Sequence, residues 1–235
     1  MAIDDLPLPV VNLLNVIGIP WPYVDEDTVQ SLATLTREFA QAVQSTHDDA
    51  TGTIRNIASA YRGSATDAMT SGWAKLSARH VDEIVDGCQV LAVALEVAAG
   101  YIVAQKVEAL AVLTGMAAAF VADQAAAVAT AGIAEAAVPV IIEGAERLMK
   151  SLVLDLEQYV IGKVIEAAAK PLFTSISDAL AGLDWSRSGA EVDPATGVTL
   201  DAEEVAIHIA ALRLHADIIQ QHGARFRQAV AGLAF

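Results

Sequence analysis

The sequence has little cysteine and few aromatic residues. Cys88 is the only cysteine among 235 residues, so the chain cannot form an internal disulfide and lacks the clustered thiols of a structural zinc site. Aromatic residues make up 5% of the chain and hydrophobic residues 54%, so the apolar content is mainly Ala, Val, Leu and Ile. This mixture is typical of closely packed helices. We expect Cys88 to be a small buried side chain.

Positive charge is also scarce. Lys and Arg total 14 against 29 Asp and Glu, which gives a formal net charge of −15. Nucleic acids and anionic membrane surfaces attract basic proteins, so this balance excludes nucleic acid as a partner and disfavours anionic membranes. The composition favours protein partners, in particular those with basic surfaces.

From the sequence we expect neither a signal peptide nor an apolar run long enough to span a membrane. Asp4 and Asp5 stand where a signal peptide would carry positive charge, so export through a cleaved peptide is not expected. Charged residues interrupt the Ala-rich middle, and no uninterrupted apolar run reaches the roughly 18 to 20 residues of a membrane span. Membrane contact is left open but is not predicted.

The predicted fold class is all-α, an elongated helical hairpin extended into a multi-helix bundle. Apolar residues recur at helical spacing over most of the length, and no strand-like alternation persists. We predict a single domain over residues 1–235. Its parts are a hairpin core over 27–100, Ala-rich helices over 101–182, a loop over 183–200 and a C-terminal helix over 201–235. Gly100, Gly115 and Gly132 are expected to be packing positions between close helices, and Pro139 is expected to start or kink a helix.

The N-terminal region predicts a short helix followed by an extended strap. Residues 6–19 are largely apolar, with Pro9 suited to a first helical turn and Gly18 to a helix end. Residues 20–23, Pro-Trp-Pro-Tyr, cannot be helical because each proline disfavours the helical conformation of the residue before it.

A long helix is predicted from Asp27 to about Tyr61. Asp27 with Gln30 is interpreted as its capping box. Its apolar stripe comprises Val29, Leu32, Phe39, Val43, Ala50, Ile54, Ile57 and Tyr61. His47 stands beside two aspartates, but sequence neighbours point around a helix rather than together, so we interpret His47 as part of a solvated surface.

The whole chain is organised around the break that follows this helix. Gly63 is expected to take a left-handed backbone conformation, and Ser64 to cap the next helix, with Asp67 in its first turn. Tyr61 and Trp73 flank the joint, where two large aromatic side chains could pin the helix crossing. An ordinary helix–turn–helix corner accounts for the local chemistry equally well.

The last helix begins with a second capping signal, Asp201 with Glu204. Its expected seam is Val205, Ile209, Leu212, Ala216, Ile219, Gly223, Phe226 and Val230. His208, His215 and His222 recur every seven residues and are interpreted as a border row beside that seam, one that could respond to pH. Successive members lie roughly 10 Å apart along a helix, too far to share a metal ion.

The sequence contains no pattern that indicates catalysis. Phosphate-binding loops, dinucleotide fingerprints, zinc-protease motifs and nucleophile elbows are all missing from it. We predict that the chain is not an enzyme, with no catalytic residues, no metal site and no cofactor.

The corner resembles a known family. Helix, aromatic-x-Gly turn (Tyr61-Arg62-Gly63), second helix and following Trp73 are similar to the WXG family of type VII (ESX) secretion substrates. With residues 7–9, Pro-Leu-Pro, and 18–22, Gly-Ile-Pro-Trp-Pro, the chain resembles the longer WXG-like domains at the front of actinobacterial polymorphic toxins. In this chain tyrosine replaces the family's usual tryptophan in the turn.

The resemblance implies a secretion or delivery module that acts by helix–helix association. It implies Tyr61, Gly63 and Trp73 as motif and partner-binding residues, with a small WXG-family protein, the secretion machinery or a second copy as partner. The family's Tyr-x-x-x-Asp/Glu export signal does not follow the second helix; Tyr23 with Asp27 has the spacing but precedes the hairpin.

The implied location is the cytoplasm before export, and the exterior or cell surface after export without a signal peptide. Two other functions stay open. The Ala-rich middle could belong to a conditional pore-forming or membrane-inserting protein. The chain could also be a structural helical scaffold.

Overall fold

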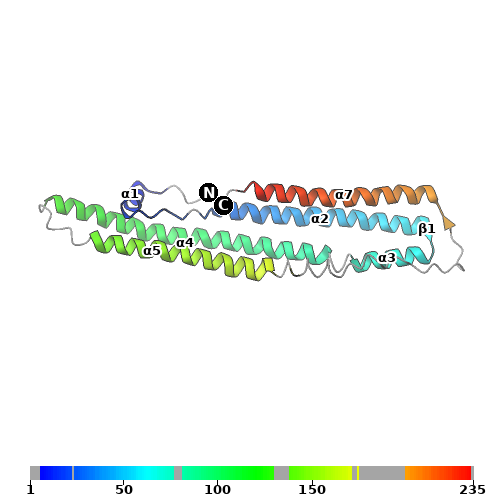
Figure 1. The fold of residues 1–235 in the computed structure, drawn as a ribbon, viewed down its shortest axis with the longest axis horizontal. Helices are drawn as coiled ribbons and strands as arrows, with labels where there is room; N and C mark the ends of the chain where they lie inside the picture. Colours follow the sequence, from blue (N-terminus) through cyan, green and yellow to red (C-terminus); the bar gives the residue numbers. More distant parts are fainter. Residues whose placement is uncertain are drawn as a thin grey trace. The chain divides into compact units, whose positions relative to one another are not determined.

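The computed structural model describes residues 6–22, 24–76, 81–129, 138–170, 174 and 199–233. It confirms the all-α fold class (Figure 1). The α-helices are α1 (Leu8–Ile17), α2 (Glu26–Ala60), α3 (Ser64–Leu76), α4 (Asp82–Ala129), α5 (Val138–Tyr159) and α7 (Ala202–Ala231), and η2 (Val160–Ala169) is a π-helix. Two short strands, β1 (Tyr61–Arg62) and β2 (Thr199–Leu200), pair with each other.

The chain divides into two compact units, each assembled from segments distant in the sequence. The first comprises residues 1–31 and 94–165 with residue 235, and the second comprises 32–93 and 166–234. The single domain over 1–235 stays a prediction. Of the predicted loop over 183–200, only Thr199 and Leu200 lie within the described residues, and they form β2.

In the first unit, α1 begins and ends as its sequence predicts. Pro9 lies in the first turn, and Gly18 ends the helix at φ 68° while its N–H donates to the Leu14 carbonyl. Glycine takes this left-handed conformation without a Cβ penalty. Val10 and Leu13 are buried, and the Trp21 side chain of the extended segment is buried too. The expected short helix is therefore confirmed.

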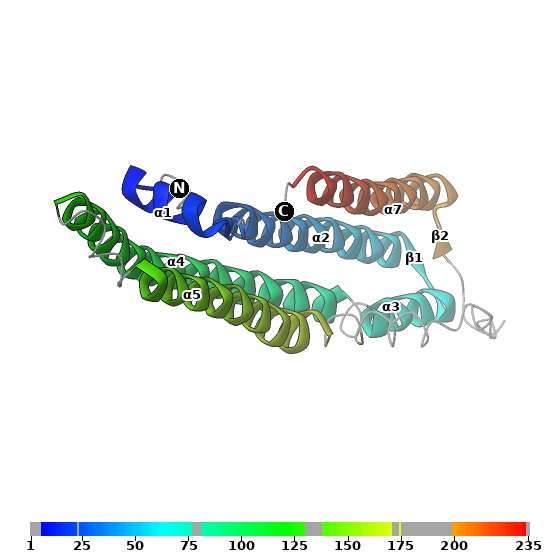
Figure 2. The same ribbon diagram turned by 60° about the vertical axis from the view of Figure 1, so that its left-hand side comes forward.

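The core of the first unit lies along α4 and α5, which run side by side in Figures 1 and 2. α5 begins at Val138, so Pro139 is in its first turn as expected. The buried face of α5 presents Ala145, Met149, Leu152 and Leu156, and that of α4 presents Ala98, Ile102, Lys106, Ala109, Leu113 and Ala117.

Fewer glycines lie at close helix contacts than the sequence predicts. At Gly144 of α5, a Cβ would lie 3.3 Å from Met116 Cε, so the missing side chain allows a close approach. Gly100 and Gly115 were expected to be packing positions, but both are exposed and a Cβ on either would meet nothing within 4 Å. Gly132, the third such expectation, lies outside the described residues.

The first unit also buries an ion pair. Lys106 Nζ lies 2.7 Å from Glu26 Oε2, and the two side chains are only 0% and 3% exposed. Buried charges persist in proteins when they are paired and hydrogen-bonded, because an isolated charge would lose its hydration. Lys106 interrupts an apolar helix in the sequence, and in the fold it is a core residue.

α4 carries many exposed apolar side chains on its other faces. The exposed valines are Val90, Val93, Val97, Val103, Val107, Val112 and Val121. Among the described residues, the segment Asp82–Ala126 is long and apolar enough to cross a bilayer, although a third of its most apolar window is buried and the core helix of a soluble protein has the same properties. The segment qualifies even though charged residues interrupt it.

The start of α2 differs from the expected capping box. The helix begins at Glu26, and Asp25 is its cap: Asp25 Oδ1 accepts from the Asp27 N–H at 2.9 Å and Oδ2 from the Thr28 hydroxyl at 2.7 Å. Asp27, expected as the cap, lies in the first turn and is exposed. Three acidic residues in a row made the capping position ambiguous.

We expect the Asp25 cap to make stability depend on pH. The Thr28 hydroxyl, helped by two backbone N–H groups and by the charge of Lys106, lowers the pKa of Asp25 against an opposing effect of burial. Folding thus favours the ionised carboxyl, which stabilises the protein above its unfolded pKa of about 3.9 and loses this contribution as pH falls through the lower folded pKa.

The measurement compares the free energies of unfolding of the parent and of Asp25→Asn between pH 6 and about pH 2.5. Asparagine also caps helices but does not titrate, so it is a matched control. The advantage of the parent should shrink as the pH falls; an advantage that is constant across this range would contradict the prediction.

In the second unit, α2 packs against the start of α4. Ala40 and Val43 form a buried cluster with Val85 and Cys88, flanked by half-buried Phe39. The expected buried position of Cys88 is confirmed, and burial raises the pKa of its thiol. Of the predicted stripe on α2, Val29, Val43, Ala50, Ile54 and Ile57 are buried.

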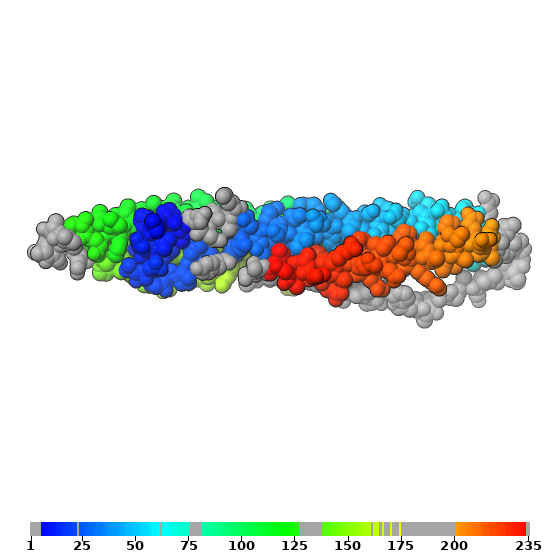
Figure 3. Space-filling model, turned by 90° about the horizontal axis from the view of Figure 1, so that it is seen from above, coloured from blue at the N-terminus to red at the C-terminus, as the bar shows by residue number. Residues whose placement is uncertain are grey.

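α7 lies antiparallel along α2 in Figures 1 and 2, and Figure 3 shows its red and orange atoms lying against the blue atoms of α2. His215 Nε2 lies 3.3 Å from Thr53 Oγ1, and His222 Nε2 lies 3.1 Å from Thr46 Oγ1. The Phe226 ring stacks on Phe39, with centroids 4.9 Å apart.

These contacts correct the predicted seam of α7. Ile209, Ala216 and Ile219, assigned to the seam, are exposed, whereas His215 and His222, assigned to a border, face α2. The physical reason is on the partner helix: Thr46 and Thr53 are also seven residues apart, so two hydroxyl–imidazole contacts form in one antiparallel register.

Candidate protein-interaction site

The predicted corner is a short bridged turn between α2 and α3. Tyr61 pairs with Leu200 and Arg62 with Thr199 in the antiparallel β1–β2 pair. The Thr66 hydroxyl donates to the Tyr61 carbonyl at 2.8 Å, and the Thr66 N–H donates to the Gly63 carbonyl at 3.0 Å. The corner is therefore tied both to the first turn of α3 and to the segment that leads into α7.

Two expectations about this corner are wrong. Gly63 does not have a positive φ; Gly18 is the glycine that does among the described residues. Ser64 is the first residue of α3 rather than a cap with a side-chain hydrogen bond, and the Thr66 hydroxyl makes the local bond instead. The β1–β2 pairing fixes the turn, so no left-handed residue is needed. Asp67 does lie in the first turn of α3, as expected.

Trp73 attaches α3 to α2. Its Nε1–H donates to Thr51 Oγ1 at 2.9 Å, and its ring stacks on His47 with centroids 5.2 Å apart and planes 16° apart. His47 is 7% exposed, so its interpretation as a solvated surface residue is wrong. The aromatic partner ten residues beyond Gly63 covers it, which no sequence neighbour could reveal.

The three proposed motif residues do not form one cluster. Tyr61 and Gly63 are adjacent, because a Cβ at Gly63 would lie 3.5 Å from the Tyr61 hydroxyl. Trp73 contacts α2 at Thr51, ten residues before Tyr61, which is about 15 Å along a helix. Tyr61 and Trp73 are both half-buried, so the corner offers Tyr61 alone as an aromatic contact.

The candidate export signal is described only in part. Tyr23 lies outside the described residues. Asp27 is exposed in the first turn of α2, where its N–H donates to the Asp25 cap. A negative side chain here suits the positive end of the helix dipole, so Asp27 has a structural role whether or not it acts in export.

A comparison with protein families identifies the fold around the corner. The model of the WXG100-like domain matches residues 5–144, which is more than half of the chain and contains α1 to α4 with the corner and Trp73. This chain belongs to the WXG100-like family. No curated protein and no solved structure matches it.

Family membership places the protein among type VII secretion-related helical proteins. The WXG100-like family is non-enzymatic, its members typically associate with protein partners, and they are secreted by a type VII route. Among the described residues, no group of three or more His, Cys, Asp or Glu side chains is arranged to hold a metal ion.

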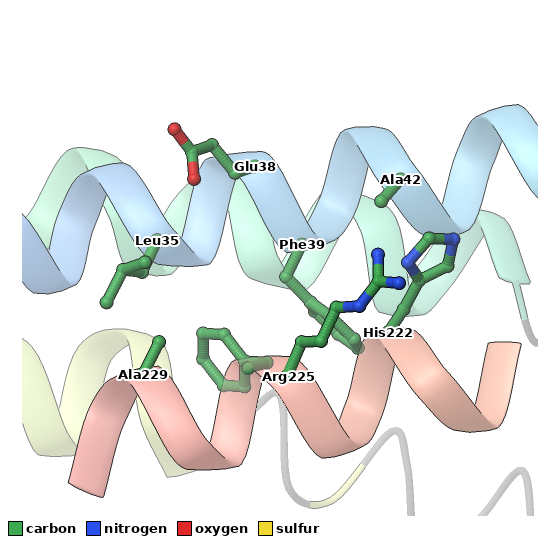
Figure 4. Close-up of a pocket in the computed structure, with 8 residues that line it drawn as sticks. Leu35, Glu38, Phe39, Ala42, His222, Arg225 and Ala229 are labelled. Atoms are coloured by element: carbon green, nitrogen blue, oxygen red, sulfur yellow. The ribbon is translucent and has the colours of Figure 1, made fainter. Parts of the chain in front are cut away.

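α7 lies beyond the region that matches the WXG100-like domain and forms a groove with α2. The groove has a volume of about 170 Å³ and is lined by Leu35, Glu38, Phe39, Ala42, His222, Arg225, Phe226 and Ala229. Figure 4 shows Arg225 extending from α7 toward α2, whereas Glu38 points away from α7. The groove depends on the register of two helices distant in the chain, so no local sequence pattern predicts it.

Proposed function

We propose that this WXG100-like protein is a non-catalytic export and delivery module of the type VII (ESX) class, linked to a toxin in an actinobacterium. It acts by helix–helix association with a protein partner. The observation that carries the proposal is the match of the family over residues 5–144, which includes the α2–α3 hairpin and its aromatic-x-Gly corner.

The hairpin supports this proposal because it is held from two sides. β1–β2 pairing fixes the corner, and Trp73 fixes α3 on α2. A rigid corner loses little entropy on binding, so Tyr61 can act as an aromatic anchor at low cost. The partner is a small WXG-family protein, the secretion machinery or a second copy of the chain, and the net charge of −15 steers association toward a basic surface.

Export in this proposal starts in the cytoplasm and needs no cleaved signal peptide. Tyr23 and Asp27 have the spacing of the family's export signal and are its candidates in this chain. Asp27 also lies in the first turn of α2. The variant that tests its role in export is therefore Asp27→Asn, which keeps the shape of the side chain and removes its charge.

We expect Gly63→Ala to separate folding from export. The φ of Gly63 is not positive, and an added Cβ would make only ordinary contact with the Tyr61 hydroxyl, so the melting temperature should not fall. If the corner binds a partner, export and association should fall by about tenfold, as for a binding hot spot.

Tyr61→Ala and Trp73→Phe complete this test. Phenylalanine keeps much of the stacking surface against His47 but removes the bond to Thr51, a loss of about 1 kcal/mol in stability. The readouts are the melting temperature, the exported fraction, and co-purification with the small WXG-family protein. If all three folded variants are exported and bind like the parent, the corner is only structural.

Membrane insertion is the second candidate function, because α4 is long and apolar enough to span a bilayer. Liposome leakage, measured at neutral and acidic pH, distinguishes it from delivery. Leakage that depends on the protein would favour insertion. If the protein neither causes liposome leakage nor binds a partner, the results favour a structural scaffold.

A further inference from the structure

We propose that the groove between α2 and α7 binds a peptide segment of a partner protein in which an apolar side chain is followed by a carboxylate. The segment inserts the apolar side chain between Phe39 and Ala229 and pairs its carboxylate with Arg225. One wall of the groove is α7, which lies beyond the family match, and the proposal does not depend on the corner at Tyr61.

The shape of the groove favours a single side chain as the occupant. Its volume of about 170 Å³ is below the roughly 300 to 1,000 Å³ of pockets that enclose small ligands. The lining is mainly apolar, from Leu35, Phe39, Ala42, Phe226 and Ala229. No described residue of α7 is fully buried, so the α7 side chains that line the groove are partly accessible to a partner.

The walls of the groove are preorganised. Phe39 and Phe226 stack on each other, and the imidazole of His222 is held by Thr46 of α2. Binding to walls that are already ordered loses less conformational entropy than binding to mobile ones. The groove can therefore accept a side chain without rearranging either helix.

The charge at the rim of the groove indicates which polar group the bound peptide carries beside its apolar side chain. Arg225 extends toward α2 and makes no ion pair within the described part of the chain, and Glu38 points away (Figure 4). From residue 213 to 231, α7 carries three arginines and one aspartate, in a protein whose net charge is −15. The Arg225 guanidinium at the rim therefore favours a carboxylate beside the apolar anchor.

The test uses two end-blocked helical peptides of 14 residues with the intact protein, so that the probe has no terminal charge. One carries a central leucine with a glutamate four residues later, and the other carries lysine in place of that glutamate. Binding is measured by fluorescence anisotropy, and the site is mapped by amide chemical shifts.

We expect the glutamate peptide to bind more tightly than the lysine peptide and to shift the amides of residues 35–42 and 222–229. Arg225→Glu should lower the affinity for the glutamate peptide by about tenfold and raise the affinity for the lysine peptide, because the sign of the charge at the rim is reversed. The matched control is Arg213→Glu, which makes the same charge change on α7 outside the groove and should leave both affinities nearly unchanged.

Ala229→Phe provides a second variant that changes no charge. A phenyl ring should fill the groove and abolish binding of the glutamate peptide. Equal effects of Arg225→Glu and Arg213→Glu, shifts outside the groove, or no binding at millimolar peptide would overturn the proposal. Binding of dodecanoate without binding of the peptide would also overturn it, because the groove would then hold a small amphiphile.

Discussion

Lys106→Met is expected to destabilise the protein by about 3 to 5 kcal/mol, the usual result of removing one partner from a buried ion pair. Lys106 and Glu26 are almost completely inaccessible to solvent and lie 2.7 Å apart. Methionine matches the lysine chain in length but removes the ammonium group that lies beside the buried Glu26 carboxylate. Urea unfolding followed by circular dichroism measures the loss.

The double variant Glu26→Leu with Lys106→Met tests whether pairing is the cause. Replacing both charged side chains by apolar ones also removes the buried Glu26 charge, so most of the stability lost in Lys106→Met should return. The control is Lys150→Met on α5, where the pair with Glu146 is exposed and its loss should cost less than about 1 kcal/mol. Equal losses at Lys106 and Lys150 would contradict a buried pair.

Leu113→Ala should cost about 3 kcal/mol, because deleting a fully buried leucine side chain removes apolar burial and leaves a cavity. Its neighbour Val112 is 42% exposed, whereas Leu113 is 0% exposed. Val112→Ala should therefore change the free energy of unfolding by less than about 1 kcal/mol. Comparable losses at the two positions would mean that α4 buries a different face.

Local signals in the sequence predicted several helix boundaries correctly. Gly18, Pro139 and Asp201 each act through groups within a few residues: a backbone conformation, a missing N–H and a carboxylate that accepts from the Glu203 and Glu204 N–H groups. The reciprocal half of the last capping box did not form, because the Asp201 N–H instead approaches the Ala60 carbonyl at 3.5 Å. The boundary was predictable, but this long-range bond was not.

The faces of the helices were harder to predict. α4 is apolar on nearly all sides, so periodicity could not distinguish buried Leu113 from exposed Val112. On α7, both the apolar residues and the histidines recur every seven positions, so spacing alone does not identify the face that packs on α2. The Thr46 and Thr53 pair of α2 has the same spacing as His215 and His222, and this match involves two helices distant in the chain.

The sequence predicts which residues belong to the candidate site but not how they are arranged in space. Tyr61, Gly63 and Trp73 lie on the hairpin as the family resemblance implied, but Trp73 faces α2 and not the corner. The β1–β2 pairing that fixes the corner joins residues far apart in the chain, and each strand has only two residues. Such short strands have no alternation that a sequence could display.

The histidine contacts of α7 also determine where each ring carries its hydrogen. Thr46 Oγ1 donates its single hydrogen to the Ala42 carbonyl, and Thr53 Oγ1 donates to the Asp49 carbonyl. Each hydroxyl oxygen can therefore only accept from its histidine, so His222 and His215 are both the Nε2–H tautomer. Two of the three histidines that recur every seven residues on α7 thus donate hydrogen bonds to α2 through Nε2–H.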